Sequence, residues 1–204
     1  MITIVDYGMG NLRSVQKAFE LYYSKVRISS IPEDILSSDK VVLPGVGAFS
    51  RAMEELKKRS LVDPIAEIVK KGKPFLGICL GLQLLFEESE EGGRVAGLNI
   101  LKGKVRRFKD LNGLKIPHMG WNKVRTTHYA RRTTILNNIA DGSYMYFVHS
   151  YYVEPEDKNI AVCRTDYGLS FTSGIQRDNI YAFQFHPEKS QCLGLRIIKN
   201  FVDM

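Results

Sequence analysis

The sequence predicts an α/β fold of three layers, in which helices cover both faces of a mostly parallel sheet and antiparallel hairpins extend that sheet. Two observations support this prediction. In the first half of the chain, short apolar runs alternate with segments of helical periodicity, as in parallel sheets covered on both faces. Over residues 98–176 the apolar runs are short and turns are frequent, as at 110–113 and 141–143, which indicates antiparallel hairpins.

The expected elements follow one another along the chain as strand and helix in turn. Strands are expected at 2–5, 26–28, 41–43, 74–78 and 181–185. Helices are expected at 12–22, 48–58, 64–70, 80–86 and 193–202. Because the sequence has 204 residues and shows no repeat or low-complexity linker, we expect a single domain over residues 1–204.

The composition is that of an ordinary globular protein, with 44% hydrophobic and 25% charged residues. Lysine and arginine outnumber aspartate and glutamate by 29 to 22, which gives a net charge of +7. These basic residues are scattered and form no basic tail, so a solvated basic surface is favoured over a nucleic-acid binding site. A basic face that suits an anionic substrate or an acidic partner stays open.

The cysteines and the N-terminus indicate the compartment. Cys79, Cys163 and Cys192 are an odd number without the spacing of a metal site, so free thiols in a reducing compartment are expected. The first six residues lack the basic region and long apolar stretch of a signal peptide. No segment reaches the ~20 apolar residues needed to span a membrane. We therefore expect a cytoplasmic protein that does not bind membranes.

The strongest local signal is the segment GICLG at 77–81, which follows an apolar strand and opens a helix. It is the cysteine version of the nucleophile elbow, a sharp turn that holds its central residue in a strained backbone conformation. Cys79 would lie at a helix N-terminus, where the dipole and free amides favour the thiolate. The amide of Leu80 could donate to an oxyanion. The alternative is a buried cysteine that packs as a small apolar residue, and the strand–turn–helix context disfavours it.

A nucleophilic thiol needs a base, and that base needs a group that orients it. His186 ends an apolar strand, and Glu188 follows two residues later across a proline. Because α/β sheets place their ligands at the carboxyl ends of parallel strands, His186 could act on the thiol while Glu188 holds its tautomer. Taken alone, this pair would more often be a surface salt bridge. No histidine–cysteine pair has the spacing of zinc ligands, so no metal is expected.

Two glycine loops follow predicted strands. The segment PGVG at 44–47 is either a plain turn or a source of backbone amides for an anion, because glycine permits the angles needed. Its strand would end beside the elbow, which favours the second interpretation for Gly45, Val46 and Gly47. The segment GMGNL at 8–12 resembles a phosphate loop only weakly, because the rest of that fingerprint is missing.

The elbow, extended to GICLGLQ at 77–83, and FHPE at 185–188 together resemble the class I, triad-type glutamine amidotransferases. Further segments narrow the resemblance to the glutaminase subunits of imidazole glycerol phosphate synthase. These segments are DYGMGNL at 6–12, LPGVGAF at 43–49, HMGWN at 118–122, YFVHSY at 146–151 and QFHPEKSQ at 184–191. The resemblance therefore extends over nearly the whole chain.

The resemblance implies a reaction and roles for individual residues. Cys79 would attack the side-chain amide of glutamine, His186 would pass a proton to the leaving ammonia, and Glu188 would orient the histidine. The amide of Leu80 and one amide from the loop at 44–47 would form the oxyanion hole. The products would be glutamate and ammonia, and no cofactor is implied.

The resemblance also implies a partner. Ammonia would enter a cyclase subunit of the (βα)₈-barrel type and react with a phosphoribulosyl imidazole-carboxamide intermediate. The products would be imidazole glycerol phosphate and an aminoimidazole carboxamide ribonucleotide, in histidine biosynthesis. Gln83 would help to hold the glutamine. Met119, Trp121, Tyr146 and Lys189 match positions near the interface of that heterodimer.

Other interpretations stay open beside this one. Another α/β cysteine hydrolase would use a different histidine position and lack the His-Pro-Glu segment. An amidotransferase subunit of a different synthase would share every catalytic residue. A non-catalytic binding module is disfavoured by the intact Cys79, His186 and Glu188. At the expected interface, Trp121 could instead be a core residue and Lys189 a solvated lysine.

Overall fold

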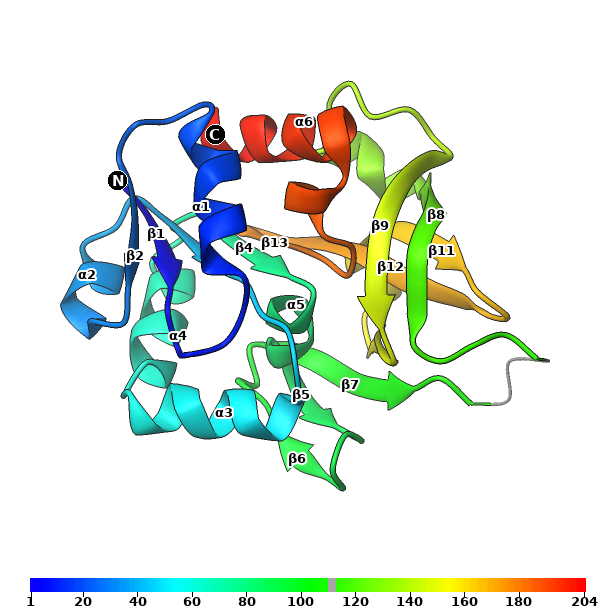
Figure 1. The fold of residues 1–204 in the computed structure, drawn as a ribbon, viewed down its shortest axis with the longest axis horizontal. Helices are drawn as coiled ribbons and strands as arrows, with labels where there is room; N and C mark the ends of the chain where they lie inside the picture. The colour runs from blue at the N-terminus through cyan, green and yellow to red at the C-terminus, as the bar shows by residue number, and fades with distance from the viewer. Residues whose placement is uncertain (110–112) are drawn as a thin grey trace.

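The computed structural model describes residues 1–109 and 113–204, so the turn predicted at 110–113 lies outside the described residues except for its last position. The described strands join into one large mixed sheet with helices packed on it (Figure 1). The predicted α/β fold is confirmed. Among the described residues, no helix is both long and apolar enough to cross a membrane.

Five parallel strands form the centre of the fold. Their order across the sheet is β2-β1-β3-β4-β13. They are β1 (Ile2–Val5), β2 (Val26–Ser29), β3 (Lys40–Leu43), β4 (Phe75–Ile78) and β13 (Ile180–Phe183). The chain alternates between a strand and a helix here, because each parallel neighbour requires a crossover connection.

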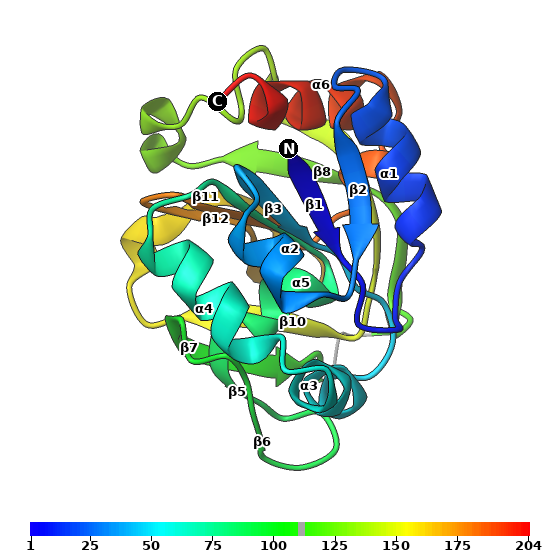
Figure 2. The ribbon, with the colours of Figure 1, turned by 90° about the vertical axis from the view of Figure 1, so that its left-hand side faces the viewer.

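Helices cover both faces of these strands (Figure 2). On one face lie α1 (Leu12–Glu20) and α6 (Gln191–Val202), whose apolar residues join one buried cluster. On the other lie α2 (Pro32–Leu36), α3 (Phe49–Lys58) and α4 (Val62–Lys70), whose apolar residues join a second cluster. Side chains of a strand alternate between the two clusters, which explains why most residues of β1, β3, β4 and β13 are apolar.

The second half of the chain extends the sheet with mainly antiparallel pairs. Beyond β13 the order continues β12-β10-β7-β5-β6. These strands are β5 (Phe86–Ser89), β6 (Val95–Ala96), β7 (Leu101–Arg107), β10 (Tyr151–Pro155) and β12 (Ser170–Arg177). The antiparallel region predicted from the short strands is therefore present, with one parallel pair, β5 and β7, inside it.

A second branch leaves the sheet at β12. There β11 (Ala161–Asp166) pairs with β12 and with β8 (His118–Thr126), and β8 pairs with β9 (Ser143–His149). The 3₁₀ turn His128–Arg132 lies between β8 and β9, and the 3₁₀ turn Lys158–Ile160 lies between β10 and β11. The antiparallel pair β8–β9 lies next to helix α6 (Figure 1).

Several expected boundaries differ by one or two residues, and one helix was not predicted. Helix α5 spans only Leu80–Leu84, and the chain enters β5 at Phe86. Strand β13 ends at Phe183 instead of Phe185. Helix α2 was not expected, although Pro32 stands in its first turn, where proline is well tolerated. In the first two cases the apolar run continues past the end of the element, because the next residues are buried by other parts of the sheet.

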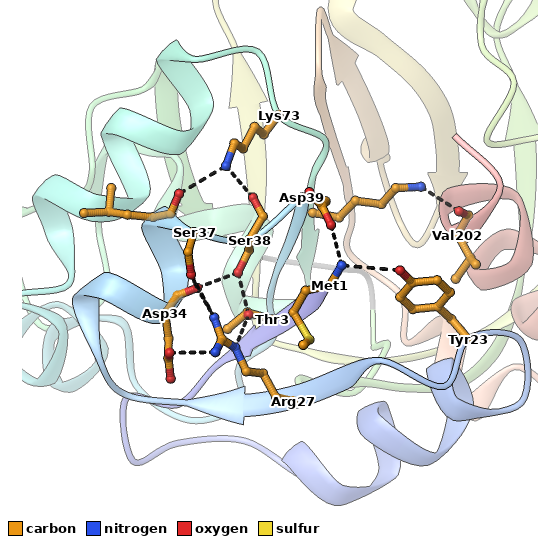
Figure 3. Close-up of polar contacts among 12 residues, drawn as sticks. Met1, Thr3, Tyr23, Arg27, Asp34, Ser37, Ser38, Asp39, Lys73 and Val202 are labelled. Atoms are coloured by element: carbon orange, nitrogen blue, oxygen red, sulfur yellow. Dashed lines mark hydrogen bonds and ion pairs between the residues drawn. The ribbon is translucent and has the colours of Figure 1, made fainter.

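Polar contacts join the amino ends of the parallel strands (Figure 3). Arg27 donates to Thr3 Oγ1 at 3.0 Å and forms an ion pair with Asp34 at 2.6 Å. Lys73 Nζ donates to the carbonyls of Leu36 and Ser38 at 3.1 and 2.5 Å. This end of the sheet is closed by internal hydrogen bonds, which leaves the opposite, carboxyl ends of the strands for a site.

Candidate active site

Cys79 lies between β4 and α5 in a strained backbone conformation. Its φ is 55° and its ψ is −106°, a region that residues other than glycine rarely adopt. The amide of Cys79 donates to the carbonyl of Phe183 at 2.7 Å, which fixes the turn against the neighbouring strand. The predicted elbow is therefore present at the carboxyl end of β4, and it places the thiol at the start of α5.

The two glycines of the elbow are required by close approach. A Cβ on Gly81 would lie 1.8 Å from the carbonyl oxygen of Leu43. A Cβ on Gly77 would lie 2.9 Å from the carbonyl oxygen of Gly81 and 3.0 Å from the side chain of Ala182. Because these contacts are mostly to backbone atoms, only glycine allows α5 to pack this closely on β3 and β4.

His186 and Glu188 follow β13 and are both buried. His186 Nδ1 lies 2.8 Å from Glu188 Oε1, so the carboxylate fixes the proton on Nδ1 and leaves Nε2 toward the thiol. His186 Nε2 and Glu188 Oε2 have no hydrogen-bond partner among the described residues. The backbone amide of His186 donates to Tyr146 O at 2.9 Å, which ties this loop to β9. An unpartnered buried imidazole nitrogen is suited to proton transfer.

The charge state of His186 is set by opposing effects. Burial disfavours the imidazolium, but the nearby Cys79 and the hydrogen bond to Glu188 outweigh it and raise the pKa of His186 to about 10. The side-chain nitrogen Nε2 of Gln184 donates to Cys79 Sγ at 3.7 Å. The arrangement therefore favours the imidazolium form of His186 next to the sulfur of Cys79.

The loop at 44–47 faces α5 with a carbonyl and not with an amide. Gly45 O accepts a hydrogen bond from the amide of Leu80 at 3.4 Å, so this donor is already occupied. Tyr7 Oη donates to Pro44 O at 2.9 Å and holds the start of the loop. A Cβ on Gly45 would lie 2.1 Å from Tyr7 Oη, so the backbone needs glycine there. Gly47 has a φ of 102°, which also favours glycine.

A cavity of about 420 Å³ opens in front of Cys79. It is lined by residues that the sequence singled out: Val46, Gly47, Cys79, Leu80, Gln83 and Lys189. Gln83 Nε2 donates to Tyr151 O and to Gln184 Oε1, both at 3.1 Å, which fixes this side chain in the wall. Cys79 and most of the predicted substrate-binding residues therefore line one cavity, whereas Gly45, His186 and Glu188 lie outside its wall and border a separate small pocket.

No role in the site was predicted for the other residues of the wall, although four of them belong to the segment YFVHSY at 146–151. They are Glu91, Pro117, Val148, His149, Ser150 and Tyr151. Glu91 brings a carboxylate into the cavity, and its Oε2 accepts a hydrogen bond from the amide of Phe49 at 2.8 Å. No local pattern marked Glu91, because the connection between β5 and β6 carries it back toward α3. Gln184 precedes the His-Pro-Glu segment directly, and that adjacency is a signal that could have identified it.

An exposed apolar surface lies on β8 and β9, near the cavity. Met119 is 65% exposed and Trp121 is 46% exposed, so Trp121 is not a core residue. Trp121 pairs across the strands with Tyr146, and their rings meet edge to face at 6.1 Å. Lys189 lies in the 3₁₀ turn Pro187–Lys189 and lines the cavity. Large exposed apolar side chains of this kind are characteristic of protein interfaces.

The loop at 8–12 and the two other cysteines do not line this cavity. Asn11 Oδ1 accepts from the amide of Ser14 at 3.2 Å, so the loop at 8–12 caps α1 with its own side chain. Cys163 is buried and Cys192 is exposed. Within the described ranges, no group of three or more histidine, cysteine, aspartate or glutamate side chains is placed to hold a metal ion.

Comparison with known proteins gives one consistent result. The family model described as "Glutamine amidotransferase class-I" matches residues 3–204. The imidazole glycerol phosphate synthase subunit HisH of Syntrophotalea carbinolica is 53% identical over 209 residues, covering 100% of both chains. The same subunit of Methanocaldococcus jannaschii is 52% identical over 204 residues, again covering 100% of both.

Solved structures agree on the fold. PurLQS from Thermotoga maritima gives a TM-score of 0.75 at 18% identity and covers 99% of this chain and 97% of its own. The glutaminase domain of Trypanosoma brucei CTPS, solved with bound acivicin, gives 0.68 at 17% identity and covers 98% and 91%. Together with the full-length relatives, these matches show that the chain belongs to the class I glutamine amidotransferase family, and within it to the HisH subunits of imidazole glycerol phosphate synthase.

Proposed function

We propose that this chain hydrolyses glutamine to glutamate and ammonia and passes the ammonia to a cyclase partner. The observation that carries the proposal is the strained Cys79 elbow in the wall of a cavity, with the buried His186–Glu188 pair next to the thiol. A cysteine in a strained turn at a helix start and a carboxylate-oriented histidine are the parts that acyl transfer requires. Full-length relatives that are about half identical support the same activity.

The reaction proceeds in two steps with His186 moving the protons. In the first, the Cys79 thiolate attacks the side-chain carbonyl carbon of glutamine, and the C–N bond breaks as Nε2 of the imidazolium protonates the leaving nitrogen. Ammonia and a thioester result. In the second, His186 takes a proton from water, the hydroxide attacks the thioester, and glutamate and the thiolate are released. Glu188 holds the imidazole and stabilises its charge throughout.

The oxyanion of each step needs donors that the loop at 44–47 controls. In the structure, Gly45 O accepts from the amide of Leu80, the amide proposed as the first donor. Rotation of the Gly45–Val46 peptide by about half a turn would withdraw that carbonyl and present the Val46 amide, which supplies a second donor. Glycines at 45 and 47 lower the cost of such a rotation. This mechanism leaves the chain weakly active until the loop rearranges.

The partner in this proposal is a cyclase of the (βα)₈-barrel type, bound as a heterodimer. It would use the ammonia to form imidazole glycerol phosphate and an aminoimidazole carboxamide ribonucleotide in the cytoplasm. Its contact surface on this chain would include Met119, Trp121, Tyr146 and Lys189, of which Met119 and Trp121 are strongly exposed. We also propose that residues 1–204 act as one domain without a cofactor.

The first test is the assay of glutamine hydrolysis by the complex of this chain with its cyclase. We predict that Cys79→Ala lowers glutaminase turnover by about 10⁴-fold or more, because a triad acts as a unit and loses its nucleophile. Synthesis from free ammonium should persist, since that chemistry lies on the partner. Cys192→Ser, which changes an exposed cysteine outside the cavity, is the matched control. Glutamine turnover that survives in Cys79→Ala would refute the nucleophile assignment.

A further inference from the structure

Two buried histidines that the mechanism does not use lie next to each other beside the cavity. His118 at the start of β8 and His149 at the end of β9 are 3% and 6% exposed. His118 Nδ1 lies 2.9 Å from His149 Nε2. The rings of His118 and Phe147 are stacked, with centroids 4.8 Å apart, so the pair is held in one orientation. His149 itself lines the cavity of Cys79.

One end of this pair fixes which nitrogens carry protons. His149 Nδ1 lies 2.8 Å from the carbonyl oxygen of Tyr151, which can only accept. His149 Nδ1 is therefore the donor. If His149 is neutral, its Nε2 is a bare acceptor, and the facing Nδ1 of His118 must donate to it. His118 Nε2 is then also a bare acceptor.

The other end of the pair requires the same arrangement independently. Asn122 Nδ2 lies 3.2 Å from His118 Nε2 and also donates to Asp166 O at 2.9 Å. Asn122 Oδ1 accepts from the amide of Lys123 at 2.7 Å. These two backbone partners orient the amide so that its nitrogen, a donor, faces His118. Both ends therefore demand the same tautomer of each histidine, with the proton on Nδ1.

The environment keeps both rings neutral, as this arrangement needs. Burial lowers the pKa of His118 to about 4. Burial also lowers the pKa of His149 to about 3, against the opposing effect of its hydrogen bond to Tyr151 O, and His118 and His186 disfavour its charge further. A protonated ring would place an N–H against another donor with no acceptor to receive it.

The chain of hydrogen bonds continues to the nucleophile. The carbonyl of Tyr151 that accepts from His149 also accepts from Gln83 Nε2 at 3.1 Å. Gln83 Nε2 in turn donates to Gln184 Oε1, and Gln184 Nε2 donates to Cys79 Sγ at 3.7 Å. Removing the donor from His149 would leave the Tyr151 carbonyl with Gln83 as its remaining side-chain donor, and would weaken the support of this wall of the glutamine cavity.

We propose that His118 and His149, aligned by Asn122, are positioning residues that hold the Tyr151 carbonyl and thereby Gln83 in the wall of the glutamine cavity. The series of hydrogen bonds also joins this wall to β8, the strand that carries the exposed Met119 and Trp121. This inference rests on the proposed glutaminase function for its kinetic consequence. The tautomers themselves do not depend on that function.

The direct test is the tautomeric state of the histidines in the wild-type chain, measured by two-bond ¹⁵N–¹H couplings of the imidazole rings at neutral pH. We expect His118 and His149 each to be neutral, protonated on Nδ1 and bare on Nε2. A proton on Nε2 of either ring would overturn the proposal. This measurement needs no variant, so a folding defect cannot obscure it.

The kinetic test compares two variants of His149 in the complex with the cyclase. His149→Leu removes both hydrogen bonds and is expected to raise the KM for glutamine roughly tenfold, while kcat changes by a smaller factor. His149→Asn can still donate to Tyr151 O from the position of Nδ1 and should restore most of the affinity. His128→Leu, at an exposed histidine in the 3₁₀ turn His128–Arg132, is the control.

The outcomes separate the two proposals. A loss of folded protein alone would lower apparent turnover without moving KM, so the shift in KM and its rescue by asparagine identify positioning. If the wild-type complex is active and His149→Leu has the same KM for glutamine, the inference is overturned and the proposed function is unaffected. A wild-type complex that does not hydrolyse glutamine would refute the proposed function, and the tautomers would then decide the inference by themselves.

Discussion

At the scale of single residues, the histidines around the thiol differ in which nitrogens are free. Both ring nitrogens of His149 are engaged, one by Tyr151 O at 2.8 Å and the other by His118 at 2.9 Å. His186 keeps Nε2 without a partner among the described residues. A base must have a nitrogen free to receive the proton, so His186 is suited to that role and His149 is not.

This difference predicts the ranking of three variants. We expect His186→Ala to lower glutaminase turnover nearly as much as loss of the thiol, because no other nitrogen can replace Nε2. Glu188→Gln should be milder, since the amide can still orient the imidazole but no longer stabilises its charge. Steady-state kinetics of the complex would check this ranking. Full activity in His186→Ala would show that another group is the base.

At the scale of elements, charge pairs link the neighbouring strands β5 and β7. Glu87 pairs with Lys102 and Glu88 pairs with Lys104, at 2.7 and 2.8 Å. Glu90 accepts from the amide of Arg107 at 3.1 Å, and these contacts hold the pKa of its carboxyl below the ordinary value of 4.5. The backbone hydrogen bond from Arg107 is the largest cause, followed by the Arg106 side chain.

The lowered pKa of Glu90 predicts that acid destabilises the fold around β5 and β7. Between the lowered folded pKa and about 4.5, the unfolded chain binds more protons than the folded chain, so stability falls as pH falls. Above pH 4.5 the contribution of Glu90 to the free energy of unfolding is fully present. We expect the melting temperature of wild type to drop as pH is lowered through this window, and the drop to be smaller in Glu90→Gln. Glu20→Gln, at the exposed end of α1, is the control. Equal slopes in wild type and Glu90→Gln would contradict the prediction.

At the scale of the whole molecule, the amino ends and the carboxyl ends of the parallel strands have different roles. Side-chain and backbone hydrogen bonds close the amino ends of the strands (Figure 3). Cys79, the loop at 44–47 and His186 follow the carboxyl ends of β4, β3 and β13. The exposed apolar surface of β8 and β9 lies beside this site, because Tyr146 O accepts from the amide of His186. A partner on that surface would therefore contact the loops that carry the chemistry.

We predict that the chain alone hydrolyses glutamine poorly and that a cyclase carrying its nucleotide ligand activates it. Freeing the Leu80 amide and adding one further oxyanion donor should each raise the rate of glutamine hydrolysis roughly 10²–10³-fold. Glutamine turnover would be measured for the chain alone, with the cyclase, and with cyclase and nucleotide. Equal turnover in all three conditions would leave a constitutive glutaminase.

A matched pair of variants would test the rotating peptide. Val46→Pro removes the amide that would turn toward the oxyanion, whereas Val46→Ala keeps it. Activation by the partner should be lost in the first and retained in the second. Activation that persists in Val46→Pro would assign the second donor to a different amide.

Local sequence determined the parts of the site that lie on consecutive residues. The elbow needs a strand, a turn with close-packed glycines and a helix in succession, and Gly77 and Gly81 are sterically required for it. The same holds for His186 and Glu188, which a single turn brings to 2.8 Å. Helix α5 and strand β13 were predicted too long, because an uninterrupted apolar run carries no sign of where an element ends.

Tertiary structure alone decided the contacts between segments far apart in the chain. Glu91 enters the cavity, His118 meets His149 across 31 residues, and Gly45 turns its carbonyl toward Leu80. None of these follows from periodicity or spacing, because hydrogen bonds between distant segments depend on strand order and register. The sequence by itself determined which groups can carry out the chemistry; the folded sheet decided which of them face one another, since only its register sets the distances between their atoms.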